Sequence, residues 1–361
     1  MKRLSLIALL VAVMAGNGFA ATVGTWYGAL EGDLNYAVGT GHWEDPYWNS
    51  PAVYLPPGPG TSGDEVKIIR DATVCTVATN VGDYSWTMTV GSLMTGGAAA
   101  RMEILPGGYL GMREVRIGGG GTTGSDTITG YLDQTGGTLT VYNDGDIIVG
   151  RMGNAAAKKG VGYYTISGGT ITYDSLTTTT KGRLYVGGAS GTEGMNGATG
   201  TFTVIGDDAS ITMKKLYVGA QTATRYGAGD LEFKIDAGGV SPIRLADADS
   251  IILDQAGANS TADLIISLIA APPAGNILLV ENTNAGAVSG LFDSVNGGPA
   301  LEGAPVILSY GGNNYNYSLT YAGGIGGNDI VLIPEPATLA LLGLGGLIVA
   351  ARRPRSRKSE V

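Results

Sequence analysis

Two side chains that carry much of enzyme chemistry are almost missing from this sequence of 361 residues. Cys75 is the only cysteine and His42 is the only histidine. A single histidine argues against Ser-His-Asp and Cys-His catalytic sites, and it excludes zinc sites that need two or more imidazoles. A single cysteine excludes an intramolecular disulfide. Because Cys75 alternates with Val74 and Val77, we interpret it as a small strand residue rather than a reactive thiol.

Charged residues are also scarce, and basic ones are the scarcer kind. The chain has 22 Lys and Arg against 31 Asp and Glu, a net charge of −9. Lys2 and Arg3 open the chain and five more cations lie within 352–358, so the part between these ends is more acidic than the net charge suggests. An acidic body repels nucleic acid and anionic lipid, so we expect no nucleic-acid partner. The alternative is that dispersed carboxylates only aid solubility.

Glycine, by contrast, is abundant, with 61 residues. It recurs at the end of a short phrase in which apolar residues alternate and Val-Gly or Ile-Gly follows. The four clearest copies are Val115–Gly118, Ile147–Gly150, Leu184–Gly187 and Leu216–Gly219, so that the glycines are 32, 37 and 32 residues apart. A near-constant step with variable loops indicates a repeat architecture.

Each step has room for three short strands of alternating pattern, with glycine at the corners and no helical period. This predicts an all-β chain in which every repeat is one coil of a single-stranded parallel β-helix. One coil has too few inward apolar side chains to fold alone, so stability must come from stacking. With a degenerate first coil at 71–103, the β-helix repeats are predicted to span 71–245.

The regions on either side of the repeats differ in composition. Residues 21–70 hold Trp26, Trp43 and Trp48 and a cluster of prolines, which favours an N-terminal cap over the first coil, with a carbohydrate-stacking platform as the alternative. Residues 246–333 contain apolar runs separated by turns, which predicts antiparallel strands that close the far end.

The N-terminus has the features of a secretory signal peptide. Residues 1–20 begin with Lys2 and Arg3, continue through an apolar stretch and end in Gly18-Phe19-Ala20. Cleavage by signal peptidase is predicted after Ala20, and a retained membrane anchor is the alternative.

The opening around Trp43 and Trp48, the Gly-Gly and Val-Gly repeats, and the ending from Tyr317 to Leu332 together resemble bacterial autotransporter-associated passenger repeats. The resemblance covers most of residues 40–333. It implies a right-handed β-helix and says little about activity.

The last segment, residues 334–361, is more specific. Pro334-Glu335-Pro336, an apolar stretch at 337–351 and a basic tail at 352–361 that includes Arg352, Arg353 and Arg355 resemble the PEP-CTERM sorting signal. The family more usually has Val where this chain has Ile333. A helix of 15 residues reaches about 22 Å across a hydrocarbon core of roughly 30 Å, which is marginal for a permanent transmembrane helix. The arginines should keep the tail in the cytoplasm and the body outside the inner membrane.

The PEP-CTERM resemblance implies transient inner-membrane anchoring, removal of the tail by an exosortase, and delivery of the body to the cell surface or the exopolysaccharide matrix. An ordinary C-terminal anchor is the alternative.

Motifs that could carry chemistry have plainer explanations. Gly119–Gly124 matches G-x-G-x-x-G, but no helix pattern follows it to bind a phosphate. Gly323–Asp329 is similar to a calcium-binding nonapeptide, with one copy and Asn328 at the acidic position. The carboxylate pairs Asp144 with Asp146, Asp207 with Asp208, and Asp247 with Asp249 all lie in predicted turns, where Asp is favoured for structural reasons. We therefore expect no catalytic, cofactor or metal site.

These observations favour a non-catalytic surface or matrix protein. The alternative is a carbohydrate-binding adhesin with a ladder of exposed aromatic residues. Tyr185 and Tyr217 occupy one outward strand position in successive repeats, but Arg116 and Ile148 hold it in the earlier copies. A polysaccharide lyase or glycosidase is a distant third possibility, because it would need clustered carboxylates on one face.

Overall fold

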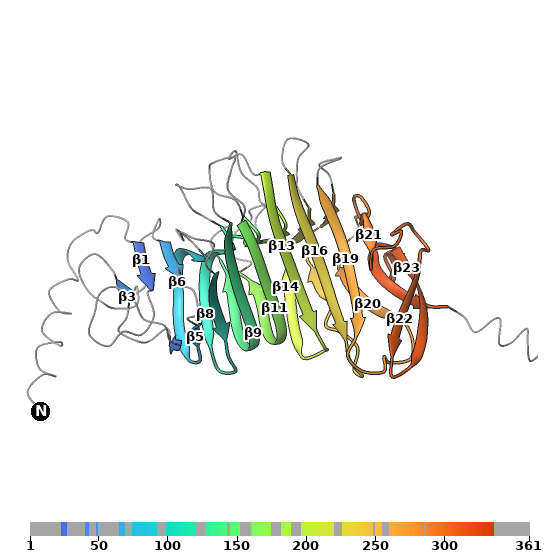
Figure 1. Ribbon diagram of the computed structural model, residues 1–361, viewed down its shortest axis with the longest axis horizontal. Coiled ribbons are helices and arrows are strands. Elements are labelled where there is room, and N and C mark those ends of the chain that lie inside the picture. The colour runs from blue at the N-terminus through green and yellow to red at the C-terminus, as the bar shows by residue number, and fades with distance from the viewer. Residues whose placement is uncertain are drawn as a thin grey trace, which may run out of the picture.

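A computed structural model describes residues 23–26, 40–42, 48–49, 65–68, 74–91, 99–119, 127–142, 145–151, 160–174, 182–188, 196–219, 226–247, 250–254, 260–284 and 286–335. The described residues form twenty-four strands in one large, mostly parallel sheet, and no helix occurs among them. The prediction of an all-β chain is confirmed. Figure 1 shows an elongated body in which the strands lie side by side along the long axis.

The parallel strands form three ladders, in each of which a strand pairs with its counterpart from the next repeat. The first ladder joins β1 (Val23–Trp26), β4 (Glu65–Ile68), β6 (Asn80–Val90), β8 (Tyr109–Ile117), β10 (Ile147–Val149), β12 (Arg183–Val186), β15 (Lys215–Val218) and β18 (Ile251–Leu253). It contains all four clear copies of the Val/Ile-Gly phrase, which pair in register.

The second ladder joins β2 (Thr40–His42), β5 (Val74–Val77), β7 (Ala99–Ile104), β9 (Ile128–Val141), β11 (Gly160–Tyr173), β13 (Asn196–Ile205), β16 (Tyr226–Ile235), β19 (Thr261–Leu268) and β21 (Ser294–Val295). The third uses the first halves of β6 and β8 and the second halves of β9 and β11, and continues through β14 (Ala209–Met213), β17 (Ile243–Leu245) and β20 (Ile277–Asn282).

The parallel pairing extends beyond both boundaries that the sequence suggested. β1, β2 and β4 lie in the segment predicted as a cap, yet they are rungs of the first two ladders. At the other end β18, β19 and β20 add one more parallel rung to each ladder after residue 245. Their apolar runs lack the Val-Gly ending, but strand pairing depends on the inward apolar positions, which these runs still supply.

Antiparallel pairing occurs at the two ends of the described body. β3 (Trp48–Asn49) pairs with β1, which places Trp48 opposite Trp26. Near the C-terminus β22 (Pro305–Tyr310), β23 (Asn313–Gly323) and β24 (Asp329–Pro334) form an antiparallel sheet, and β24 also pairs with β20. We call β22, β23 and β24 the end sheet.

The core runs through all the described repeats and continues into the end sheet. The inward residues of the four phrases, such as Val186 and Val218, are almost completely buried, which supports the predicted inward positions. The end sheet adds inward side chains to the same core, namely Val306, Leu308, Tyr317, Leu319, Tyr321, Ile330 and Leu332. Its inner face therefore packs on the last rungs of the ladders.

The glycine that ends each phrase is required for two reasons, its backbone conformation and the lack of space for a Cβ. Gly118, Gly150, Gly187 and Gly219 all have positive φ, between 68° and 79°, where side chains with a Cβ are strained. At Gly187 a Cβ would also overlap the backbone carbonyl of Ala228 in the next repeat. The absence of a Cβ at this corner thus allows the end of the phrase to approach the backbone of a second-ladder strand closely.

A second column of glycines, which was not predicted from the sequence, lies inside the second ladder. Gly130, Gly162, Gly200 and Gly229 are neighbours in register. A Cβ on any of them would overlap the carbonyl of the residue before a phrase glycine, for example Val149 beneath Gly200. The two glycine columns therefore face each other across the corner.

The described residues contain no helix with the length and apolar character needed to cross a membrane. The helix predicted at 337–351, the signal peptide with its cleavage position Ala20, and most of the long loops after the Val/Ile-Gly phrases lie outside the described residues.

Candidate functional site

The sorting motif begins inside the folded body. Pro334 is the last residue of β24 and pairs with Tyr317 of β23. One residue further on, the backbone N–H of Glu335 donates a hydrogen bond of 3.0 Å to the carbonyl of Asn316. Pro334 has no N–H to donate, so the N–H of Glu335 is the donor that holds this end of the chain onto the sheet. The rest of the motif, Pro336, and the basic residues Arg352, Arg353 and Arg355 lie outside the described residues.

The end sheet leaves this junction partly open to solvent. Ile333 is 37% exposed and the side chain of Glu335 is also exposed, whereas Leu332 is fully buried. The two motif residues that the structure describes are therefore extended and accessible from outside, but they remain hydrogen-bonded to a neighbouring strand.

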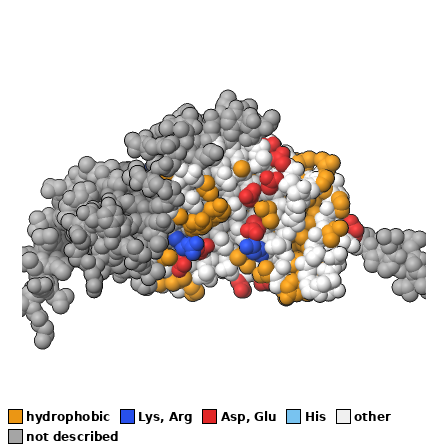
Figure 2. Space-filling model, viewed as in Figure 1, with side chains coloured by type: hydrophobic (Ala, Val, Ile, Leu, Met, Phe, Trp, Pro, Cys, Tyr) orange, Lys and Arg blue, Asp and Glu red, His pale blue; other side chains and the backbone are white. Residues whose placement is uncertain are grey.

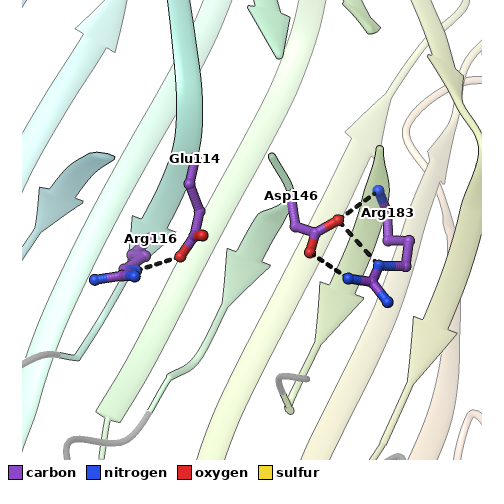
Figure 3. A network of polar contacts seen from close by, with 4 residues as sticks. All are labelled: Glu114, Arg116, Asp146 and Arg183. Atoms are coloured by element: carbon purple, nitrogen blue, oxygen red, sulfur yellow. Dashed lines mark hydrogen bonds and ion pairs between the residues drawn. The ribbon is translucent and has the colours of Figure 1, made fainter. Parts of the chain in front are cut away.

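Four of the six carboxylates considered as catalytic candidates lie among the described residues. Asp146 is 4% exposed, and its carboxylate accepts hydrogen bonds from the backbone N–H of Arg183 and from Nε and a terminal nitrogen of the same guanidinium, at 2.8–3.0 Å (Figure 3). Asp207 and Asp208 are exposed in a turn, and Asp247 follows β17. Asp144 and Asp249 lie outside the described residues.

The Asp146–Arg183 pair connects one repeat to the next, whereas the nearby contact of Glu114 with Arg116 lies within β8 (Figure 3). Burial disfavours the charged guanidinium of Arg183, but the hydrogen bonds and the negative charge of Asp146 outweigh it, and the pKa of Arg183 is raised. A carboxylate held in this way ties one strand of the ladder to the next.

The tyrosines predicted to face outward are instead buried. Tyr185 is 0% exposed and Tyr217 is 7% exposed, and their rings stack with centroids 4.7 Å apart. They form a second, small apolar cluster with Ile148, Ala198 and Ile252. The strand register placed them correctly on the outer face of the first ladder, but this face is covered, so they do not form an exposed aromatic ladder.

A different aromatic stack is accessible on the second ladder. Tyr131 of β9 and Tyr163 of β11 are register neighbours, both half-buried, with ring centroids 4.9 Å apart and planes 9° apart. The guanidinium of Arg101 lies 5.1 Å above the ring of Tyr131. This stack was not predicted from the sequence, although the spacing of Tyr131 and Tyr163, 32 residues, equals the commonest repeat length.

The same outer column becomes acidic toward the C-terminus. After Thr201 it continues with Asp230 and Asp263, and Glu232 lies two residues along β16. Burial raises the pKa of Asp230, the hydrogen bond from Thr201 opposes the rise, and the charges of Asp263 and Glu232 add to it. Figure 2 shows hydrophobic, basic and acidic side chains together in the middle of one face of the body.

The described residues contain no group of three or more His, Cys, Asp or Glu placed to hold a metal. The loop from Gly323 to Asp329 is closed by a 3.0 Å hydrogen bond from Asn328 N–H to the Gly323 carbonyl, and Asp329 accepts one from Asn282 N–H. Of the G-x-G-x-x-G stretch only Gly119 is described, and a Cβ there would overlap the carbonyl of Arg151. This glycine serves strand packing.

Comparison with known protein families identifies the C-terminus. Residues 332–357 match the PEP-CTERM protein-sorting motif. No curated protein and no solved structure matches the chain, so the resemblance to autotransporter-associated repeats stays a prediction. A PEP-CTERM motif implies export and processing by an exosortase.

Proposed function

We propose that this chain is an exported, non-catalytic protein that an exosortase releases from the inner membrane to the cell surface or the extracellular matrix. The observation that carries the proposal is the PEP-CTERM motif at 332–357, which begins within the last strand of the body, β24. Nearly the whole described body is thus the part that is exported, and the C-terminal segment is the signal that directs its sorting.

We infer that the body is a parallel β-helix. The support is the order of pairing, because three strands recur in each repeat and every one pairs in parallel with the same strand one repeat later. We infer a right-handed β-helix from the resemblance to passenger repeats and from the right-handedness that is usual in parallel crossover connections. Such a body is a long scaffold that holds its two ends apart.

The absence of catalysis in this proposal is supported by what the candidate carboxylates do. Asp146 is bound to Arg183, and Asp207 and Asp208 lie in an exposed turn. An acid and base pair for glycoside cleavage needs two carboxylates at a defined separation across a substrate site. Depolymerisation of a neutral or acidic glycan that is lost on changing Asp207 and Asp208 to Asn would contradict the proposal.

The decisive test compares the native host with a strain that lacks its exosortase. A tag in the body follows the protein through cell fractions, and mass spectrometry of the surface form gives its C-terminal residue. We expect the mature chain to end near Pro334–Pro336 in the first strain and the intact precursor to remain in the membrane of the second. An intact tail, Ala337 to Val361, on the surface form in both strains would reduce the motif to an ordinary anchor.

A carbohydrate-binding adhesin is the second candidate, and exopolysaccharide is its proposed partner. It is supported by the half-exposed stack of Arg101, Tyr131 and Tyr163. Sugar rings bind on aromatic faces, and the face of Tyr163 that points away from Tyr131 is the one not used in the stack. Binding of host exopolysaccharide that Tyr163→Ala abolishes, while Tyr315→Ala in the end sheet leaves it unchanged, would favour this candidate.

A further inference from the structure

The exposed apolar side chains of the described residues are concentrated at the C-terminal end. Seven large hydrophobic residues are more than a third exposed, and all of them lie after residue 268: Ile269, Leu291, Leu301, Ile307, Tyr310, Ile325 and Ile333. Figure 2 shows hydrophobic side chains in a band near this end of the body. Before residue 269, every large hydrophobic residue whose exposure is described is less exposed than these seven.

Two of these residues lie on the outer face of the end sheet. In the antiparallel register Pro305, Ser318 and Ile333 form one row across the three strands, and Ile307 is opposite Asn316 in the next outward row. Ile307 is 63% exposed and Ile333 37% exposed. The opposite face of the same sheet is packed on the core, so this outer face closes the end of the molecule.

The end sheet is also unusual in its charge. Residues 303–328 contain no Asp, Glu, Lys, Arg or His. Of their four tyrosines only Tyr310 is exposed, because Tyr317 and Tyr321 are buried on the inner face and Tyr315 packs against the core. The exposed carboxylate of Glu335 lies beside Asn316 at the edge of the sheet. Tyrosine is enriched at the level of lipid headgroups, and a surface with few charges and exposed Tyr310, Ile307 and Ile333 is compatible with that level. Because it has no cation, attraction of this surface to a membrane would not depend on anionic lipid.

The path of the chain brings this surface to a membrane. Glu335 is hydrogen-bonded to Asn316 on the end sheet, and the apolar segment begins at Ala337. Two residues reach at most about 7 Å, so a membrane that contained residues 337–351 would start at the edge of the sheet. A longer tether would let the body move away from the bilayer, and here there is none.

From these observations we propose that the outer face of the end sheet rests on the lipid headgroup layer while the precursor is anchored. The inference rests on the proposed function, because it requires residues 337–351 to be in the membrane before processing. Ile307 and Ile333 contact lipid, and the long axis of the body stands away from the membrane. Removal of the tail leaves only this weak contact, so the body is free to leave.

The test uses the full chain in vesicles of zwitterionic lipid. Single cysteines replace Ile307, Ile333 or, as the matched control, the exposed Ser210 of β14, and each carries a polarity-sensitive fluorophore. The parent chain, whose only thiol, Cys75, is buried, gives the background of labelling. Lipids that carry a quencher at headgroup level then report which labels lie at the membrane.

We expect at least about twofold quenching at positions 307 and 333 and none at 210, because side chains that lie among the headgroups are close to the quencher. High salt should leave the result unchanged. Ile307→Glu should reduce the quenching of a label at 333, whereas Ser210→Glu should not.

The outcomes separate this inference from the proposed function. A chain that does not float with the vesicles contradicts the membrane anchor itself and therefore both proposals. A chain that floats, with labels at 307 and 333 that are not quenched, contradicts only the contact with lipid. Labels that shift in emission with protein concentration but ignore the lipid quencher would show that a second copy of the chain covers this face instead.

Discussion

The repeats and the end sheet are both built from β-strands, yet they differ in pairing, charge and exposure. Between the first and last strand of each ladder every strand has a parallel neighbour on both sides, the corners are glycines that leave no room for a Cβ, and Asp146 is bound to a partner in the next repeat. The end sheet carries no charged residue between Glu302 and Asp329 and keeps Ile307 and Ile333 exposed. The comparison indicates that the repeats are made for internal packing and the end sheet for contact with another surface.

The largest effect should come from charge placed on the inward side of the ladders. Val186→Asp buries an unpaired carboxylate and should lower the free energy of unfolding by about 4 kcal/mol or more. Because neighbouring repeats depend on one another, the loss should be cooperative in thermal melts followed by circular dichroism. The control is Ile307→Asp on the outer face of the end sheet, which should change stability little. Equal melting of Val186→Asp and the parent would show that the inward register is wrong.

Removal of one partner of the buried ion pair should have the next largest effect. Asp146→Ala leaves the guanidinium of Arg183 buried without its carboxylate and should cost about 3 kcal/mol. Glu281→Ala breaks the Arg244–Glu281 pair, which lies nearer the end sheet and is more exposed, and should cost less than about 1 kcal/mol. Chemical denaturation measures both. A double variant with Arg183→Met should recover part of the first loss, and no recovery would mean that the pair itself is not the cause.

Glycine replacements compare the two regions at matched backbone conformation. Gly187 has φ of 75° and Gly303, before the end sheet, has φ of 76°, but only Gly187 has backbone atoms in the way of a Cβ. Gly303→Ala should cost about 1 kcal/mol from the positive φ alone. Gly187→Ala should cost about 2 kcal/mol more, because a strand must move. Similar melting temperatures for the two variants would contradict the requirement for close approach at the phrase.

The smallest effect concerns pH. The pKa of Asp230 is raised in the folded state, so the folded chain holds this proton more tightly than the unfolded chain. The contribution of Asp230 to stability is therefore present at low pH and is lost as pH rises through its folded pKa. Asp230→Asn keeps the contact with Thr201 and should flatten this decrease in melts taken between about pH 4 and 6. An unchanged pH profile would show that another carboxyl is responsible.

Much of the repeat architecture was predictable, because the inward positions and the corners have local causes. The inward positions of Val186 and Val218 are predicted by the alternation of apolar residues along their strands. The corner at Gly187 is predicted because a glycine ends every copy of the phrase. Gln134 occupies an inward position where the alternating pattern calls for an apolar residue, and its buried side chain accepts a 2.6 Å hydrogen bond from the hydroxyl of Tyr164 one repeat later. A polar residue on an inward position is compatible with the fold only through such a partner, which a single strand pattern does not reveal.

The misses share one physical cause, which is dependence on neighbours distant in sequence. Tyr185 and Tyr217 point outward from their strands as predicted, yet packing against Ala198 and Ile252 removes them from solvent. The alternation of apolar and polar residues predicts which side chains share a face of the strand. It does not predict which other residues cover that face. The stack of Tyr131 and Tyr163 needed the register of β9 with β11, and the extension of the ladders past residue 245 needed strand pairing rather than the glycine phrase. The sorting motif was predictable because it is recognised as a linear segment, and its match at 332–357 bears this out.

The position of β24 between β20 and β23 has a mechanical consequence. Any pull on the tail of the precursor enters the body at Pro334, at the end of a strand that has hydrogen-bonded partners on both sides. Traction along such a strand is shared among its rungs, whereas an edge strand with one partner would peel away. Translocation, membrane motion or an enzyme that pulls on the motif therefore loads a strand that is paired on both sides, and the last strands of the ladders stay covered while the tail is under tension.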